Sequence, residues 1–192
     1  MKKHFKVHYF LAYEGYAELM IFAYLKNRFR SDFETSNIKF RELTDSVIFS
    51  SGKINGVKNL KDFEDKYTKI KGNYPSERFL FFIDNDLYHS SIIHNKIIIG
   101  GDLVQKMQYN SEFLLMSLYG CNLKDISEFG SDFQKFRDYC KNEFLILFGK
   151  DLKYIVNDNF LNKILKNVSD ETIKQNFDVL FSLCEYKTNH KK

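Results

Sequence analysis

The chain is short of the residues that usually interrupt regular structure. Its 192 residues contain a single proline, Pro75, and no tryptophan, and they show neither an internal repeat nor a low-complexity stretch. Hydrophobic residues make up 44% of the chain, with 20 phenylalanines and 12 tyrosines among the aromatic ones. This composition excludes an intrinsically disordered chain. It predicts a globular protein with a core rich in aromatic side chains.

Cysteines and long apolar runs are also scarce. The three cysteines, Cys121, Cys140 and Cys184, are widely spaced and form no C-x-x-C pair, so neither a disulfide framework nor a zinc site is predicted. The longest apolar runs, such as residues 19–25, are far shorter than the roughly 20 residues that span a bilayer. The first residues lack the small-residue cleavage site of a signal peptide. We therefore expect a cytoplasmic protein.

A strong excess of one charge is missing as well. The formal net charge is +4 at pH 7. Such a mild basic excess permits a polyanionic partner such as nucleic acid, but a surface of solvated lysines gives the same value. Charge alone therefore does not identify the partner.

The first half of the chain alternates between two apolar patterns. Two segments separate short apolar runs that are typical of strands. Residues 17–29 are rich in Ala, Leu and Met, which favours a helix, and residues 57–70 carry apolar residues at helical spacing. This alternation predicts an α/β fold with a mostly parallel sheet flanked by helices and joined by right-handed crossovers. A buried helix is also expected at 112–118. Strands are expected at 5–13, 45–51, 78–83 and 96–99.

From residue 123 onward the apolar spacing is helical and no convincing strand occurs. Apolar residues recur at helical intervals over 133–147, 160–165 and 173–184, and Ser131 stands where a helix N-cap is expected. We therefore predict an α/β domain over residues 1–122 and a C-terminal helical extension over residues 123–192 that packs on it.

Acidic residues follow two of the predicted strands. Glu14 follows the first strand, Asp84 and Asp86 follow the third, and Glu18 opens the helix after Glu14. Ligands of open α/β sheets sit outside the carboxyl ends of the strands. If the first and third strands are neighbours, four carboxylates meet there, and their repulsion calls for protons or divalent cations. Mg²⁺ and Mn²⁺ prefer such oxygen ligands, and they can polarise a phosphoryl oxygen and activate water.

Each of these motifs also has an ordinary structural explanation. A D-x-D sequence is common in turns that end a strand, and a glycine after a glutamate can simply mark the end of a strand. The two motifs occur in the right order, each at the end of an apolar strand. This combination favours a functional site over two unrelated turns.

Three segments together resemble the sequence blocks of the Toprim domain, which occurs in topoisomerases, bacterial primases and the OLD and RloB families of nucleases. The Toprim pattern is a glutamate after the first strand, a glycine-containing loop after the second, and D-x-D after the third. The resemblance covers about residues 5–120, and the E-G-x-x-E form is most similar to OLD-like nucleases. The matching segments are Y-E-G-Y-A-E at 13–18, S-S-G-K-I-N-G-V-K-N-L at 50–60 and F-F-I-D-N-D at 81–86.

The resemblance implies a Toprim-like fold and metal-dependent hydrolysis of nucleic acid, DNA or RNA, in a phage-defence setting. Glu14 would be a general acid/base or a metal ligand, and Glu18, Asp84 and Asp86 would hold Mg²⁺ or Mn²⁺. Residues 108–120 resemble a later block of RloB-like proteins, which makes Glu112 a candidate ligand of a second ion. The chain lacks the G-x-x-x-x-G-K-[ST] motif, so the ATPase domain of OLD proteins is not expected. A homodimer and a regulatory partner protein are both open.

Several nearby polar residues could serve the same site. Lys53 and Lys58 flank the glycine-containing loop, where they could contact phosphate or simply begin a solvated helix. His89 and His94 follow the D-x-D motif, and a surface loop is the more common place for such histidines. Asp102 follows two glycines and is predicted as a helix N-cap.

Three other functions are compatible with parts of the pattern. A nucleotide-sugar transferase also places D-x-D after an apolar strand, but little chain follows Asp86 to build an acceptor site, and Glu14 has no role there. A D-x-D-x-[TV] phosphatase would carry its motif near the N-terminus, with Thr or Val where this chain has Tyr88. A non-catalytic Toprim-fold protein that binds nucleic acid or a partner protein stays open.

Overall fold

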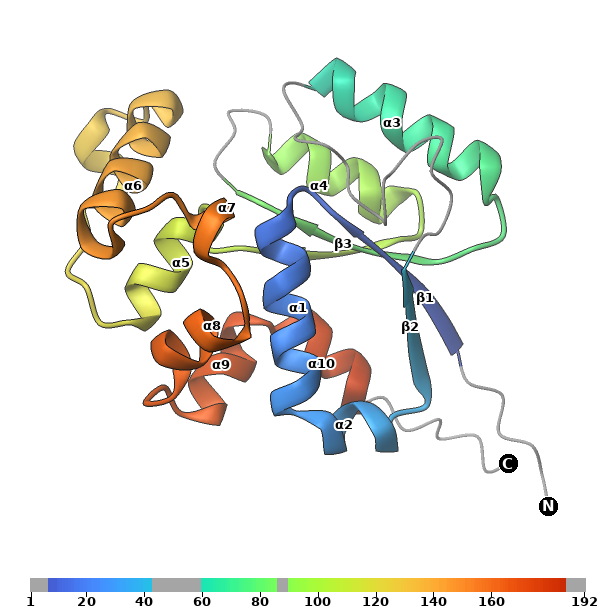
Figure 1. Cartoon of the computed structure of the whole chain (residues 1–192). Helices are drawn as coiled ribbons and strands as arrows, with labels where there is room; N and C mark the ends of the chain where they lie inside the picture. The colour runs from blue at the N-terminus through green and yellow to red at the C-terminus, as the bar shows by residue number, and fades with distance from the viewer. Residues whose placement is uncertain (1–6, 43–59, 86–89, 186–192) are drawn as a thin grey trace.

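The core of the molecule is a four-stranded sheet in which all neighbouring strands run parallel. The computed structural model describes residues 7–42, 60–85 and 90–185 (Figure 1). The strand order is β2-β1-β3-β4, so β1 and β3 lie at the centre. This arrangement, with its flanking helices and its C-terminal helices, confirms the predicted α/β fold class. The strands are β1 Val7–Tyr13, β2 Ile38–Glu42, β3 Phe79–Ile83 and β4 Leu103–Lys106.

One face of the sheet is covered by α3 Leu60–Asn73 and α4 Ser90–Ile99 (Figure 1). Phe63 of α3 and Ile97 of α4 pack there against Phe79 and Phe81 of β3. All five residues of β3 are buried, as expected for a central parallel strand that is covered on both faces. The expectation that the aromatic residues of this strand belong to the core is confirmed.

The opposite face carries the remaining helices, which include the whole C-terminal part. Leu80 and Phe82, which alternate with Phe79 and Phe81 along β3, pack into a second core with Phe177. The helices on this face are α1 Tyr16–Arg28, α2 Arg30–Thr35, α5 Ser111–Leu118, α6 Phe133–Phe148, α7 Leu152–Ile155, α8 Asp158–Leu165, α9 Asp170–Asn176 and α10 Asp178–Glu185, with the 3₁₀ turn η2 at Ile126–Phe129.

No helix in the described part combines the length and the apolar character that crossing a bilayer requires.

Two polar side chains fasten the C-terminal helices to the α/β part. The Arg28 guanidinium of α1 donates to the carbonyl oxygens of Leu165 and Val168, at 2.6 and 2.9 Å. Buried Gln105 of β4 donates to the carbonyl of Asn176 at 3.2 Å and accepts from the Leu180 N–H at 3.0 Å. These bonds satisfy backbone groups where the tail helices end and begin, so the tail is held to the sheet by polar as well as apolar contacts.

One of the predicted strands is wrong, and another lies outside the described residues. The strand expected at 96–99 is wrong, because these residues end α4 and the strand is β4, which begins at Leu103. A short apolar run cannot be assigned by periodicity alone. Here Ile93 and Ile97, four residues apart, are buried in the core while Ile99 is 85% exposed, which is a helical pattern. The strand expected at 45–51 lies outside the described residues, and β2 was not predicted.

Two predicted helix caps are also wrong. Asp102 caps no helix: it is buried before β4 and accepts from the Phe79 N–H at 3.0 Å and the Tyr67 hydroxyl at 2.8 Å. Its ion pair with Lys71 measures 3.2 Å. Burial and the bond to Asp102 raise the pKa of Tyr67 above its ordinary value. Helix α6 is capped by Asp132 rather than Ser131, which adopts the left-handed conformation with φ 62°.

We expect Asp102→Ala to lower the free energy of unfolding by about 3 kcal/mol, because it leaves the buried Phe79 N–H and the part-buried Tyr67 hydroxyl without their acceptor. Urea denaturation followed by circular dichroism measures this loss. Asp65→Ala, at an exposed position of α3, is the matched control and should change stability by less than about 0.5 kcal/mol. Equal stability of the two variants would contradict the structural role assigned to Asp102.

Candidate functional site

The two central strands end at the point where the chain reverses its direction across the sheet. From β1 the chain crosses to β2 on one side and then returns past β1 to β3 on the other. Ligands of such sheets bind in the crevice where the connections diverge. Glu14 follows β1 and Asp84 follows β3, so both residues lie at this point. The first and third predicted strands are neighbours in the sheet, with Tyr13 opposite Phe82, so the condition for their acids to meet is fulfilled.

Glu14 and Asp84 are in direct contact. The Glu14 N–H donates to the Phe82 carbonyl at 3.2 Å, which extends the β1–β3 ladder by one bond. The Asp84 N–H in turn donates to Oε2 of Glu14 at 3.4 Å. Glu14 is only 8% exposed, so its carboxylate is held inside the protein next to the end of β3.

Glu18 lies in the first turn of α1 and folds back over Gly15. The Gly15 backbone is extended, with φ −141°, so conformation does not require glycine there. The lack of space favours glycine instead, because a Cβ on residue 15 would lie 2.7 Å from Oε2 of Glu18. The other carboxylate oxygen, Oε1, accepts from the Ser111 hydroxyl at 2.5 Å. Glu18 is 4% exposed, and its position in the first helical turn favours a negative charge.

Ser111 and Glu112 open α5, whose start is set by the loop after β4. Asn110 caps the helix by accepting from the Phe113 N–H at 2.9 Å. Before it, Tyr109 has φ 61°, an uncommon conformation for a residue with a side chain. The Tyr109 carbonyl accepts from the Asn85 N–H, which ties this loop to the loop that carries Asp84. The start of α5 is thereby placed beside the ends of β1 and β3.

One cavity of about 530 Å³ joins these residues. Four carboxylate residues from separate parts of the α/β region line it, and all four were predicted as site residues. They are Glu14, Glu18, Asp84 and Glu112. The structure thus brings together the described members of the predicted acidic set. Asp86, Lys53, Lys58 and His89 lie outside the described residues.

Basic residues of the C-terminal helices also line this cavity. Arg137 and Lys141 of α6 and Lys153 of α7 line it. Sequence reasoning missed all three. The sequence did place Arg137 and Lys141 one helical turn apart, on a helix with an apolar stripe. This spacing puts both residues on one face of the helix, but it could not show which part of the molecule that face would meet.

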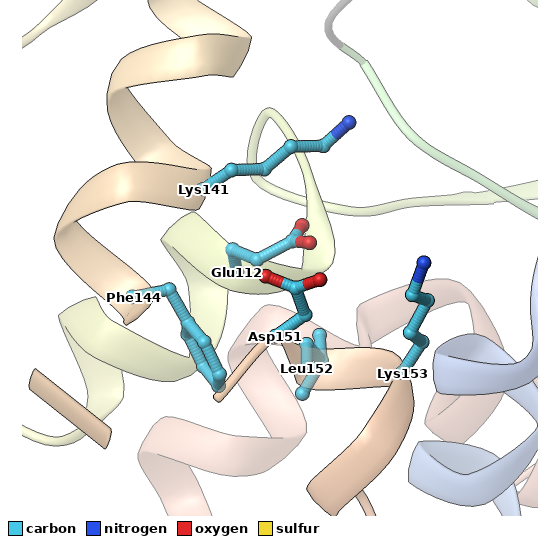
Figure 2. Close-up of a pocket in the computed structure, with 6 residues that line it drawn as sticks. All are labelled: Glu112, Lys141, Phe144, Asp151, Leu152 and Lys153. Atoms are coloured by element: carbon cyan, nitrogen blue, oxygen red, sulfur yellow. The ribbon is translucent and has the colours of Figure 1, made fainter. Parts of the chain in front are cut away.

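A smaller cavity of about 160 Å³ adjoins the larger one and shares Glu112, Lys141 and Lys153 with it (Figure 2). Asp151 adds another carboxylate. Figure 2 shows the carboxylates of Glu112 and Asp151 facing the same space, with the side chains of Lys141 and Lys153 on either side of them. The region therefore alternates acidic and basic groups instead of concentrating one charge.

The described acids match a Mg²⁺ or Mn²⁺ site in type, because these ions prefer carboxylate oxygens. Among residues 7–42, 60–85 and 90–185, no three His, Cys, Asp or Glu side chains form a group that could hold a metal ion. The predicted ligand Asp86 belongs to the segment that is not described. The metal-binding roles of these residues stay predictions.

Comparison of the chain with protein-family models, curated proteins and solved structures finds no match. The resemblance to Toprim domains therefore stays a prediction from the motifs themselves. What the structure adds is the spatial convergence of Glu14, Glu18, Asp84 and Glu112 at the carboxyl edge of a parallel sheet.

His94, the second histidine after the D-x-D motif, lies in α4 and not in a surface loop. It is 1% exposed, and within the described part its Nε2 atom has no hydrogen-bond partner. Burial, together with the nearby charge of Lys106, lowers its pKa from 6.5 to about 4. The folded protein therefore holds His94 in its neutral form at pH 7, as part of the core.

We expect acidification from pH 7 to pH 4 to destabilise the fold through His94. Below pH 6.5 the unfolded chain takes up a proton that the folded protein accepts only near pH 4, so the free energy of unfolding falls by about 3 kcal/mol over this range. Urea denaturation at several pH values measures the slope. His94→Leu, which carries no titratable group, should reduce the pH dependence, and an unchanged slope would refute this assignment.

We expect the contact between Gly15 and Glu18 to appear as coupling between two substitutions. Gly15→Ala forces the hydrogen-bonded Glu18 carboxylate to move and should destabilise the fold by about 1–3 kcal/mol. In a Glu18→Ala background the same change should be neutral or stabilise by about 0.4–1 kcal/mol, because the extended backbone accepts alanine. Thermal denaturation of the four proteins gives the coupling free energy. Additive effects would contradict the proposed close approach.

Proposed function

We propose that this protein hydrolyses phosphodiester bonds of nucleic acid with the help of a bound Mg²⁺ or Mn²⁺. The observation that carries the proposal is the direct contact between Glu14 and the end of β3 at Asp84, in a cavity that also contains Glu18 and Glu112. Carboxylates from neighbouring parallel strands are gathered there at the place where ligands of such sheets bind.

The charges around the cavity suit an anionic substrate together with a divalent cation. Among the described residues, four carboxylate residues and three basic residues line it, which leaves one negative charge in excess among them when all are ionised. A divalent cation would offset that excess and the charge of one phosphodiester. When bound, the cation would polarise a phosphoryl oxygen and lower the pKa of a coordinated water.

Glu14 is the residue to which we assign proton transfer. A water oxygen forms a bond to phosphorus, the ester bond to the leaving oxygen breaks, the proton of the water passes to Glu14, and the leaving oxygen takes a proton from solvent. The Asp84 N–H and the β1–β3 ladder hold the Glu14 carboxylate in one place, as a general base requires. Asp84 and Glu18 are assigned to cation binding. Defence against phages is the setting that the Toprim resemblance implies, and it stays a prediction.

We expect purified protein to cut at least one of pooled tRNA, single-stranded DNA and plasmid DNA when Mg²⁺ or Mn²⁺ is present, and none of them with chelator. Glu14→Gln should lower the rate by about 10²- to 10⁴-fold, the range typical of a lost acid–base group. Asp84→Asn should also lower the rate, because it removes a charge from the proposed cation site. Gel analysis of products over time measures these rates.

The matched control is Asp65→Asn, which removes the same charge at an exposed site on α3. It should cut at the wild-type rate. Circular dichroism of each variant verifies that it is folded. Absence of cutting by the wild-type protein with both ions, or full activity of Asp84→Asn, would overturn the proposed hydrolysis.

A further inference from the structure

We propose that the C-terminal helices supply a cationic wall, defined as Arg137, Lys141 and Lys153, that grips the phosphates of a single-stranded nucleic acid. The proposal rests on the proposed function in taking nucleic acid as the ligand. It assigns substrate binding to the helical extension, and it names the form of nucleic acid that the cavity accepts.

The wall is built on fixed helices. Arg137 and Lys141 are four residues apart on α6, so they lie on one face of the helix. Beside that face, Phe136 and Phe144 are completely buried, which fixes the helix against α5. Lys153 comes from α7, whose Leu152 is buried in the main core. All three basic residues line the larger cavity, and Figure 2 shows Lys141 and Lys153 at the smaller cavity that adjoins it.

The size of the cavity favours a single strand. Its volume of about 530 Å³ falls in the range of about 300–1,000 Å³ that pockets for small ligands occupy, so it can take a segment of one or two nucleotides. The acids of the sheet edge and the cationic wall line this same cavity. A single strand can place one backbone phosphate against the wall, whereas a duplex would have to enter with both strands.

An exposed aromatic ring at the cavity gives a second, independent reason for a single strand. Tyr16, in the first turn of α1, lines the cavity and is 47% exposed, in a protein whose other aromatic rings are mostly in the core. Proteins that bind single strands combine a basic groove for the backbone with aromatic rings on which unpaired bases stack. Tyr16 and the cationic wall provide both parts in one cavity.

Binding of nucleic acid is tested in a variant that lacks the proposed hydrolysis. The background is the full chain with Glu14→Gln and Asp84→Asn, in EDTA, because neutralising these acids removes both the proposed hydrolysis and their repulsion of phosphate. Fluorescence anisotropy with labelled oligothymidine, oligouridine and a hairpin duplex gives the affinity at several salt concentrations. We expect the single strands to bind more tightly than the duplex.

Neutralising the wall should change the salt dependence in a defined way. Arg137→Gln, Lys141→Gln and Lys153→Gln should each weaken single-strand binding and reduce the slope of log K against log salt by about 0.7, the value for one phosphate contact. Tyr16→Ala should weaken binding by about 5- to 150-fold with the slope unchanged. Lys150→Gln is the matched control, since Lys150 is exposed between α6 and α7, outside the described lining of both cavities, and it should have no effect.

The outcomes separate this proposal from the proposed hydrolysis. Unchanged affinity and slope in all three wall variants, no single-strand binding, or tighter binding of the duplex would overturn the cationic wall, even if the wild-type protein cuts nucleic acid. If the wild-type protein cuts nothing but the wall variants lose single-strand affinity as described, the hydrolysis fails and the wall stands as a binding site. Thermal denaturation of each variant verifies that a loss of binding is not a loss of folding.

Discussion

The parallel pairing of β1 with β3 is the constraint on which the rest of the structure depends. Parallel neighbours end at the same edge of a sheet, so the residues that follow them meet without any further device. The pairing places Glu14 beside Asp84 and leaves their loops over one cavity. The Asp84 N–H then donates to the Glu14 carboxylate, and the Ser111 hydroxyl donates to the carboxylate of Glu18. Buried carboxylates are tolerated only with such partners.

The C-terminal helices belong to the same hydrophobic core as the sheet. Phe177 and Phe181 pack with Leu80 and Phe82, and the polar bonds of Arg28 and Gln105 fasten the tail at its helix ends. Phe144 of α6 and Leu152 of α7 are buried in this same core, so the helices that carry Arg137, Lys141 and Lys153 also pack on it. This matters for the proposed function, because groups that hold a substrate act through fixed positions.

Local patterns predicted most of the elements but not all. Continuous apolar runs bounded by breaker residues indicated β1 and β3, amphipathic spacing indicated α3, and apolar segments indicated α1 and α5, all within a few residues. The run at 96–99 was assigned wrongly because isoleucines suit a strand and a buried helix alike, and only the packing of Ile93 and Ile97 on the sheet distinguishes them. The role of Asp102 was missed because its partners Tyr67 and Phe79 are distant from it in the sequence, so only the folded structure brings them together.

The sequence by itself determined the α/β class, the order of the central elements and the acids that follow β1 and β3, because these depend on the period of apolar residues and on residues next to strand ends. Only the tertiary structure decided that Ser111 holds Glu18, and that Arg137, Lys141 and Lys153 face the acids. The physical reason is that helix packing angles and the burial of the C-terminal part set these contacts. The local spacing of residues predicts neither the packing angles nor the contacts that bury the C-terminal part.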